Sequence, residues 1–307
     1  MGYGHGHGQG SSGAVGHAGG RHRWRLIVSF VLIGTFFLIE FGAGILSGSL
    51  ALISDAGHMA ADVVTLGAAL VATKVATRAD HTGRRTYGSY RAEVFASGLA
   101  VLMMLGVSVY VVLEAISRIG AAPDVATGPM LVVGLLGLLV NVAVMALLRA
   151  GAQESLNVKG AYVEVIADAA GSVGVMVAGG LILLTGQGVW DSVAAFAIGA
   201  FVAVRAVLLG REVLAVLGQH VPAGMDIDAV AAALAAVPGV CDVHDLHAWT
   251  LTSGMNVATA HLVLEAGTSA EDTLRLGQRL LREEFAIEHA TLQVEGHRST
   301  ACDAVDW

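Results

Sequence analysis

The chain has 307 residues, of which 55% are hydrophobic and only 14% are charged. Soluble domains carry roughly 25% charged residues, so this composition indicates an integral membrane protein. The net charge of −8 argues against a nucleic-acid partner. The two cysteines, Cys241 and Cys302, lie far apart and form no CxxC motif, so neither a disulfide framework nor a thiolate zinc finger is indicated.

The first 23 residues are rich in glycine, histidine and serine. They offer almost nothing to bury, so we expect a disordered cytoplasmic arm at residues 1–23. Its histidines could collect metal weakly, or the arm could be a solvated tail without a role, and the sequence leaves both open. They are His5, His7, His17 and His22.

Six apolar segments follow, and each can supply the roughly 20 residues that span a bilayer. We expect them at about residues 25–47, 50–76, 94–118, 129–149, 158–184 and 189–209. Basic residues gather before the first segment and after the second and fourth, whereas the opposite side offers little beyond Arg118. By the positive-inside rule, both termini and these two connections lie in the cytoplasm. The sequence therefore predicts a mostly α membrane protein with a six-helix transmembrane domain at residues 24–210.

From about residue 211 the pattern changes to short amphipathic segments. Residues 225–237 have helical spacing, two strand-like stretches flank a turn at residues 253–254, and a second helix opens near Ser269 in the style of a capping box. A last strand follows. The order α-β-β-α-β predicts a small, metallochaperone-like α+β domain in the cytoplasm at residues 211–296. A tail is left at residues 297–307.

The second and fifth apolar segments each carry a pair of metal-ligand residues where charge is most costly. His58 and Asp62 are four residues apart and share one helix face. Glu164 and Asp168 have the same spacing. At 1.5 Å per residue, Asp62 and Asp168 lie at similar depths. Four N and O ligands on two helices can hold a tetrahedral divalent cation, so we predict a metal site here.

An ionisable residue in a span can instead be structural and pair with a neighbour. We favour that interpretation for Asp55, and it also suits Glu40, Glu114 and Asn141. For the four predicted ligands it is weak, because a central Asp costs roughly 2.5–3.5 kcal/mol even on lenient insertion scales. Neither helix carries a basic residue at that depth. A cation is the compensation that we expect, and Asp55 is the replacement ligand to consider if Glu164 does not bind.

Several motifs resemble the cation diffusion facilitator family. They are SGSLALISDAGHMAAD in the second segment, YVEVIADAAGSVGV in the fifth, SYRAEV at the start of the third, and GVCDVHDLHAW in the soluble part. The resemblance covers about residues 24–296 and is closest to the zinc-transporting branch of bacterial heavy-metal resistance proteins and animal vesicular zinc transporters. It implies a homodimer that exchanges cytosolic Zn²⁺ for protons, with the metal held by His58, Asp62, position 164 and Asp168. Position 164 is often His in this branch, whereas here it is Glu.

The predicted sheet of the soluble part carries further candidate ligands. With the predicted turn, Leu246 pairs with His261, and His244 lies diagonally beside that pair at about 7–8 Å, so two imidazoles could bridge one metal. His289 and Glu295 share a face of the last strand but lie roughly 20 Å apart, which implies two sites or an intersubunit site. In the family resemblance, His244, His261, His289 and Glu295 fall on positions that hold cytoplasmic zinc in some members. Surface histidines without a role are the alternative.

The sequence therefore predicts a transporter and not an enzyme. We expect it to export a divalent cation, Zn²⁺ first and Co²⁺ or Cd²⁺ next, in exchange for protons by alternating access. Its partners are the lipid bilayer, which we expect to be a bacterial inner membrane, and a second copy of the chain. The alternative is a membrane metal sensor that binds without transport. A sensor would need a large extramembrane output domain, and residues 211–296 are small for that purpose.

Overall fold

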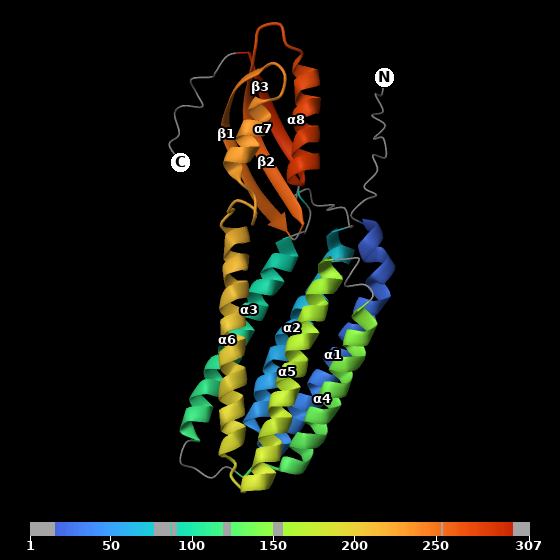
Figure 1. The fold of residues 1–307 in the computed structure, drawn as a ribbon, viewed down its shortest axis with the longest axis vertical. Coiled ribbons are helices and arrows are strands. Elements are labelled where there is room, and N and C mark those ends of the chain that lie inside the picture. The colour runs from blue at the N-terminus through green and yellow to red at the C-terminus, as the bar shows by residue number, and fades with distance from the viewer. Residues whose placement is uncertain are drawn as a thin grey trace, which may run out of the picture. The chain divides into compact units, whose positions relative to one another are not determined.

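The computed structural model describes residues 16–76, 87, 91–118, 124–149, 156–252 and 254–296 (Figure 1). At several helix ends only the backbone is described. The chain divides into two compact units, which are treated in turn. The first comprises residues 1–70 and 99–208, and the second comprises residues 71–98 and 209–307. The predicted ligands His5, His7 and the tail residue Cys302 lie outside the described residues, as do the side chains of His17 and His22.

Six long helices account for the apolar part of the chain. They are α1 (Gly16–Ser47), α2 (Leu50–Ala76), α3 (Arg91–Ser117), α4 (Thr127–Leu148), α5 (Leu156–Thr185) and α6 (Val189–Leu217). Five of these, all except α2, are long and apolar enough to cross a membrane over their described residues. In α2 most side chains beyond Val64 lie outside the described part. The predicted mostly α fold with six long helices is confirmed.

Two helices extend beyond their predicted limits. α1 begins at Gly16, inside the segment whose composition predicts disorder. α6 runs to Leu217 and does not end near residue 209, so the predicted boundary between the two domains lies within a helix. Arg211 and Glu212 end the apolar run, but charged residues do not end a helix. The helix ends at Leu217, and Gln219 just beyond it has the left-handed φ of 55° that is common after a helix end.

Asp191, in the first turn of α6, fixes the start of α2. Its buried carboxylate accepts hydrogen bonds from Ser49 Oγ at 2.6 Å and from the backbone N–H groups of Leu50 and Ala51 at 2.7 and 3.2 Å. The first N–H groups of a helix have no partner within it, and a negative charge there interacts favourably with the helix dipole. Arg118 lies 3.8 Å from the same carboxylate. One end of α2 is therefore held by α6.

Small side chains let α2, α3 and α6 approach closely further along the unit. Ala61 of α2, Ala100 of α3 and Ala206 of α6 are buried in one cluster with Met104 and Val202. Helices in membranes associate mainly through such close packing of small residues. The cluster brings the segment of α6 around Ala206 beside the ligand-bearing segment of α2. A larger apolar core contains residues of all six long helices.

The second unit contains the predicted order α-β-β-α-β. Its elements are α7 (Ile227–Ala235), β1 (Val240–Thr252), β2 (Met255–Leu264), α8 (Ala270–Phe285) and β3 (Ile287–Glu295). β2 is the central strand, antiparallel to β1 and parallel to β3. Since parallel strands need a crossover connection, α8 joins β2 to β3. Ala260 and Leu262 belong to the core that also contains residues of both helices, so His261 between them points to the opposite face of the sheet.

The register of β1 on β2 differs from the predicted one. His244 lies opposite His261, a place predicted for Leu246. The pairing shifts between Thr250 and Thr252 and again between His244 and His247, where Asp245 has a φ of 52°. Each shift adds one residue to β1 without adding one to β2, as β-bulges do. The predicted diagonal between the two imidazoles is therefore wrong, and they face each other directly.

We predict that Asp191→Ala destabilises the helical unit, because Ser49 Oγ and two buried N–H groups lose their acceptor. An unsatisfied buried donor costs about 1–3 kcal/mol. The midpoint of thermal aggregation of the detergent-purified protein should therefore fall clearly, and Asp191→Asn, which keeps one acceptor oxygen, should lie between. Asp124→Ala is the matched control, since Asp124 is exposed. Equal midpoints for the two alanine variants would contradict the capping role.

Candidate metal centres

Three of the predicted ligands converge between α2 and α5. His58 Nε2 lies 3.6 Å from Asp62 Oδ2 and 3.1 Å from Asp168 Oδ1. One ligand atom from each of the three residues lies within 4.8 Å of the other two. His58 and Asp168 are buried, and Asp62 is partly buried. An imidazole nitrogen and two carboxylate oxygens at this spacing form a donor set that suits one divalent cation.

Several polar atoms of this group have no hydrogen bond to any described residue. They include His58 Nδ1, Asp62 Oδ2 and Asp168 Oδ1, all of them buried. Buried polar atoms in folded proteins nearly always have a partner. Two carboxylate oxygens without a donor, aimed at one imidazole, are therefore the arrangement expected where a cation binds.

Glu164, the fourth predicted ligand, is turned toward a different partner. Its Oε2 pairs with the guanidinium Nη2 of Arg205 on α6, and the Glu164 side chain is 39% exposed. Arg205 Nη1 also lies 2.7 Å from His58 Nε2. Neither α2 nor α5 supplies a basic residue at this depth, but α6 does. The expectation that only a bound cation could compensate these carboxylates is therefore wrong in part.

Sequence reasoning missed Arg205, although one signal was present. It is the single basic residue within the sixth predicted apolar segment, where an arginine is as costly as the acids that drew attention elsewhere. Spacing along one helix shows which residues share a face, but it does not show which face of another helix comes opposite. That information required the packing of α6 against α2.

Asp55 lies outside this group and has an acidic neighbour. Glu40 of α1 is fully buried and lies close to the Asp55 carboxyl group. On α5, a Cβ at Gly171 would overlap the Asp55 carboxylate, so the close approach of α5 requires glycine there. The other polar residues given a structural interpretation have partners, since Glu114 pairs with Arg118 at 3.0 Å and Asn141 donates to Ser172 Oγ at 3.4 Å.

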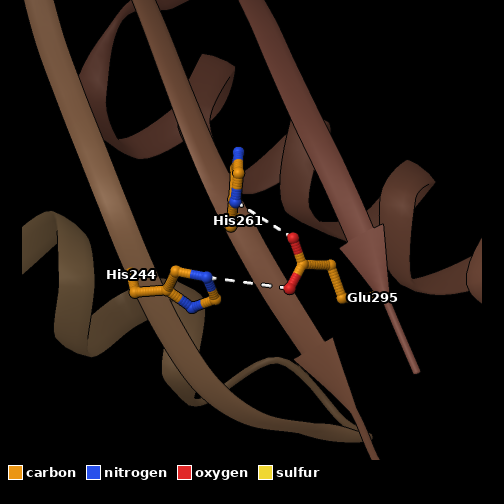
Figure 2. A group of neighbouring side chains, drawn as sticks. All are labelled: His244, His261 and Glu295. Atoms are coloured by element: carbon orange, nitrogen blue, oxygen red, sulfur yellow. Dashed lines mark ion pairs between the residues drawn. The ribbon is translucent and has the colours of Figure 1, made fainter. Parts of the chain in front are cut away.

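A second group of candidate ligands lies in the other unit, on the face of the sheet opposite the helices. Figure 2 shows His244, His261 and Glu295 projecting from β1, β2 and β3, with an ion pair from each imidazole to the carboxylate. His261 Nδ1 lies 3.0 Å from Glu295 Oε1, and His244 Nε2 lies 3.7 Å from Glu295 Oε2. The ring centroids are 5.2 Å apart. One ligand atom from each residue lies within 4.8 Å of the others, as a shared metal requires.

Two further carboxylates flank this group, and sequence reasoning did not select them. Asp242 Oδ2 lies 3.5 Å from His244 Nδ1, and Asp245 Oδ2 lies 3.7 Å from His261 Nε2. The signal was the alternation of acids and histidines in DVHDLH. Carboxylates beside metal-binding imidazoles fix their orientation and raise their basicity. Asp245 reaches His261 because the bulge turns it out of the regular alternation.

His289 is not part of this group among the described residues. It pairs with Val257 near the start of β3, whereas Glu295 lies at the end of the strand beside Val263. Its ring makes an edge contact with Tyr87, with centroids 5.6 Å apart. Three of the four ligands predicted for the soluble part thus come together, and the fourth lies elsewhere on the same strand.

Comparison with known proteins finds relatives along nearly the whole chain. Residues 26–217 match the cation efflux transmembrane domain, and residues 222–297 match the cytoplasmic domain of cation efflux proteins. The metal cation efflux system protein CzcD of Cupriavidus metallidurans is 41% identical over 281 residues, which cover 91% of this chain and 88% of that protein. The cadmium, cobalt and zinc/H(+)-K(+) antiporter of Bacillus velezensis is 34% identical over 285 residues, which cover 91% of this chain and 90% of that protein.

Two further relatives were found. The zinc transporter ZitB of Escherichia coli is 32% identical over 273 residues, which cover 88% of this chain and 87% of that protein. A solved structure of the metal-bound C-terminal domain of the CzcD transporter is 36% identical, covers 23% of this chain and 99% of that one, and has a TM-score of 0.22.

We predict that Glu295→Gln weakens Zn²⁺ binding by the soluble unit at least about tenfold, since even removal of an outer partner of a metal ligand costs that much. Calorimetry on the full-length protein measures this in an Asp62→Asn, Asp168→Asn background, which removes the intramembrane group. His289→Gln is the matched control, because it changes the same strand outside the cluster. An unchanged affinity in Glu295→Gln, or an equal loss in His289→Gln, would refute the assignment.

Proposed function

The chain belongs to the cation efflux family, and on that basis we propose that it exports Zn²⁺ from the cytoplasm in exchange for protons. It is a metal cation efflux transporter of the membrane and not an enzyme, and it assembles as a homodimer. Co²⁺ and Cd²⁺, which appear in the name of one relative, are further candidate substrates. The relatives match nearly the whole chain, and their names describe cation efflux or zinc transport. The alternative of a membrane metal sensor is therefore without support.

The observation that carries the proposal is the buried group formed by His58, Asp62 and Asp168. These side chains project from apolar helices, and their buried oxygens lack donors among the described residues. Imidazole suits Zn²⁺ and Co²⁺, and carboxylates complete such sites. We assign the transport site to these three residues and to Glu164, whose carboxylate turns from Arg205 to the metal when the ion arrives. Asp55 remains the second candidate for the fourth ligand.

Exchange for protons follows from the chemistry of the ligands. Carboxylates and imidazole bind a metal only when deprotonated, so metal and protons compete for the same atoms. In the inward-facing state the site takes up Zn²⁺, and in the outward-facing state protons displace it. Because an empty, fully charged site is costly inside the bilayer, protons also return it to the cytoplasmic side. We place both termini in the cytoplasm of a bacterium, on the strength of the basic connections.

For the soluble unit we propose a regulatory Zn²⁺ site at His244, His261 and Glu295. The support is the meeting of one ligand atom from each of three strands on the face of the sheet opposite the helices. His289 is left out of this site. Metal bound here would join β1 to β3 across β2, so that cytosolic Zn²⁺ stiffens the sheet. Loss of this site should therefore alter the metal dependence of transport without abolishing transport.

We predict that Asp168→Asn and Asp62→Asn each reduce Zn²⁺ flux in proteoliposomes under an imposed pH gradient by at least about a hundredfold, given that unpaired polar groups at this depth cost several kcal/mol. The amide keeps the shape but cannot serve as an anionic ligand. Glu114→Gln is the control, because it removes an acid of α3 that pairs with Arg118. Flux near the wild-type rate from either aspartate variant would overturn the site.

We predict that Glu164→His raises the ratio of Zn²⁺ to Mn²⁺ flux severalfold, because nitrogen ligands favour zinc whereas an all-oxygen set tolerates manganese. Glu164→Gln is the comparison, since it removes the charge without adding a nitrogen and should not raise the ratio. Competition flux assays with both metals measure it. A ratio unchanged in Glu164→His would show that Glu164 is not a ligand and would direct attention to Asp55.

A further inference from the structure

An arginine projects into the transport site from a helix that supplies none of its predicted ligands. Arg205 lies in the apolar helix α6, and its side chain is only 21% exposed. Its guanidinium reaches Glu164 on α5 and His58 on α2. The ring of Phe201, one turn earlier on α6, lies 5.9 Å from the guanidinium carbon. A cation at this depth is costly unless it is paired, so its position calls for a function.

The contacts of Arg205 use the atoms that a metal would use. A guanidinium has donors and no acceptor, so at 2.7 Å His58 Nε2 has to accept with its lone pair. That lone pair is also the one that points toward Asp62 and Asp168 and would bind a metal. The Glu164 carboxylate is likewise paired with the guanidinium of Arg205, through Oε2. Arg205 therefore occupies one atom on each of two of the four proposed ligands, and a metal has to displace it before binding His58 Nε2 or Glu164 Oε2.

The charges of the site suggest what Arg205 contributes there. With His58 neutral, the ionised carboxylates of Asp62, Glu164 and Asp168 give the site three negative charges. A divalent cation alone would leave one of them uncompensated. The permanent charge of Arg205 removes that remainder, so the loaded site is neutral. In a medium of low dielectric constant, the free-energy cost of a single uncompensated charge is a large part of the barrier to moving the site across the membrane.

We propose that Arg205 is an internal counter-cation, which binds Glu164 and His58 in the empty site and releases them when the metal arrives. This inference rests on the proposed transport site and adds a residue that competes with the substrate. In the empty site Arg205 offsets part of the charge that the departing metal leaves behind. It therefore lowers the affinity for metal and eases the return of the empty site across the membrane.

A purely structural role, a clamp between α5 and α6, makes different predictions from a counter-cation. Loss of a clamp would slow every movement of the helices, whether the site is loaded or empty. Loss of a counter-cation would act more on the empty site, whose net charge before protonation would change from −2 to −3, than on the loaded site, where it would change from 0 to −1. The cost of charge in the membrane rises steeply with its magnitude. Carrier kinetics separate these two cases, because exchange of zinc for zinc uses only the loaded site, whereas net transport also requires the empty site to return.

The test uses proteoliposomes containing the full-length protein, with Zn²⁺ as the only metal. Net efflux and tracer exchange at equal zinc concentrations are measured for the wild type, Arg205→Met and Arg205→Lys. In Arg205→Met we expect the ratio of exchange to net flux to rise about tenfold or more, given the cost of an unbalanced charge in the membrane. The half-saturating Zn²⁺ concentration should fall, because the competitor is gone. Arg205→Lys retains the charge and should lie near the wild type.

Two outcomes would overturn the inference. They are a parallel fall of exchange and net flux in Arg205→Met, and a half-saturating concentration that is unchanged or raised. Arg205→Gln, which also removes the charge, is made in parallel so that the comparison remains possible if Arg205→Met does not fold. A wild-type protein without zinc flux or exchange would instead overturn the proposed function itself, so the two failures are distinguishable.

Discussion

The cost of charge in a low-dielectric medium is the constraint on which the helical unit depends. Every ionised group among the apolar helices needs a partner, a cation or a proton. Asp191 meets this requirement with the free N–H groups of α2, and Glu114 meets it with Arg118. Among the described residues, Arg205 compensates one of the acids around His58. What is left over is the proposed transport site, whose charge balance would change with each ion that enters or leaves.

The sequence was sufficient to predict those features of the structure that depend on short-range periodicity. Long apolar runs predict six helices, and a spacing of four residues predicts that His58 and Asp62 share a face. These arguments use one helix at a time. Arg205 enters the site through the packing of α6 on α2, where Ala61 and Ala206 allow close approach, and no periodicity within either helix reveals that pairing. The extension of α6 to Leu217 was missed for a related reason, since hydropathy marks where apolar residues end and not where the helix ends.

The soluble unit shows the same division between local and non-local information. Its order of elements and the cap at Ser269 follow from local patterns, and both are present. The meeting of His244 with His261 depends on two bulges in β1, which leave no clear mark in the sequence. With a regular ladder the imidazoles would be staggered instead of lying opposite each other. The bulges of one strand thus bring His244 opposite His261, where both lie beside Glu295.

The position of Asp191 and Arg205 on one helix bears on which parts of the protein move together. They are separated by about 21 Å along α6 at 1.5 Å per residue. Asp191 joins α6 to the first turn of α2, whereas Arg205 joins α6 to α5 through Glu164 and to α2 through His58. In the proposed site a metal would take both of these side chains from Arg205 but leave the Asp191 cap intact. The substrate would thereby join α2 to α5 and free α6 from both at the depth of Arg205, so α6 is suited to pivot about its capped end, with the ion itself as the release.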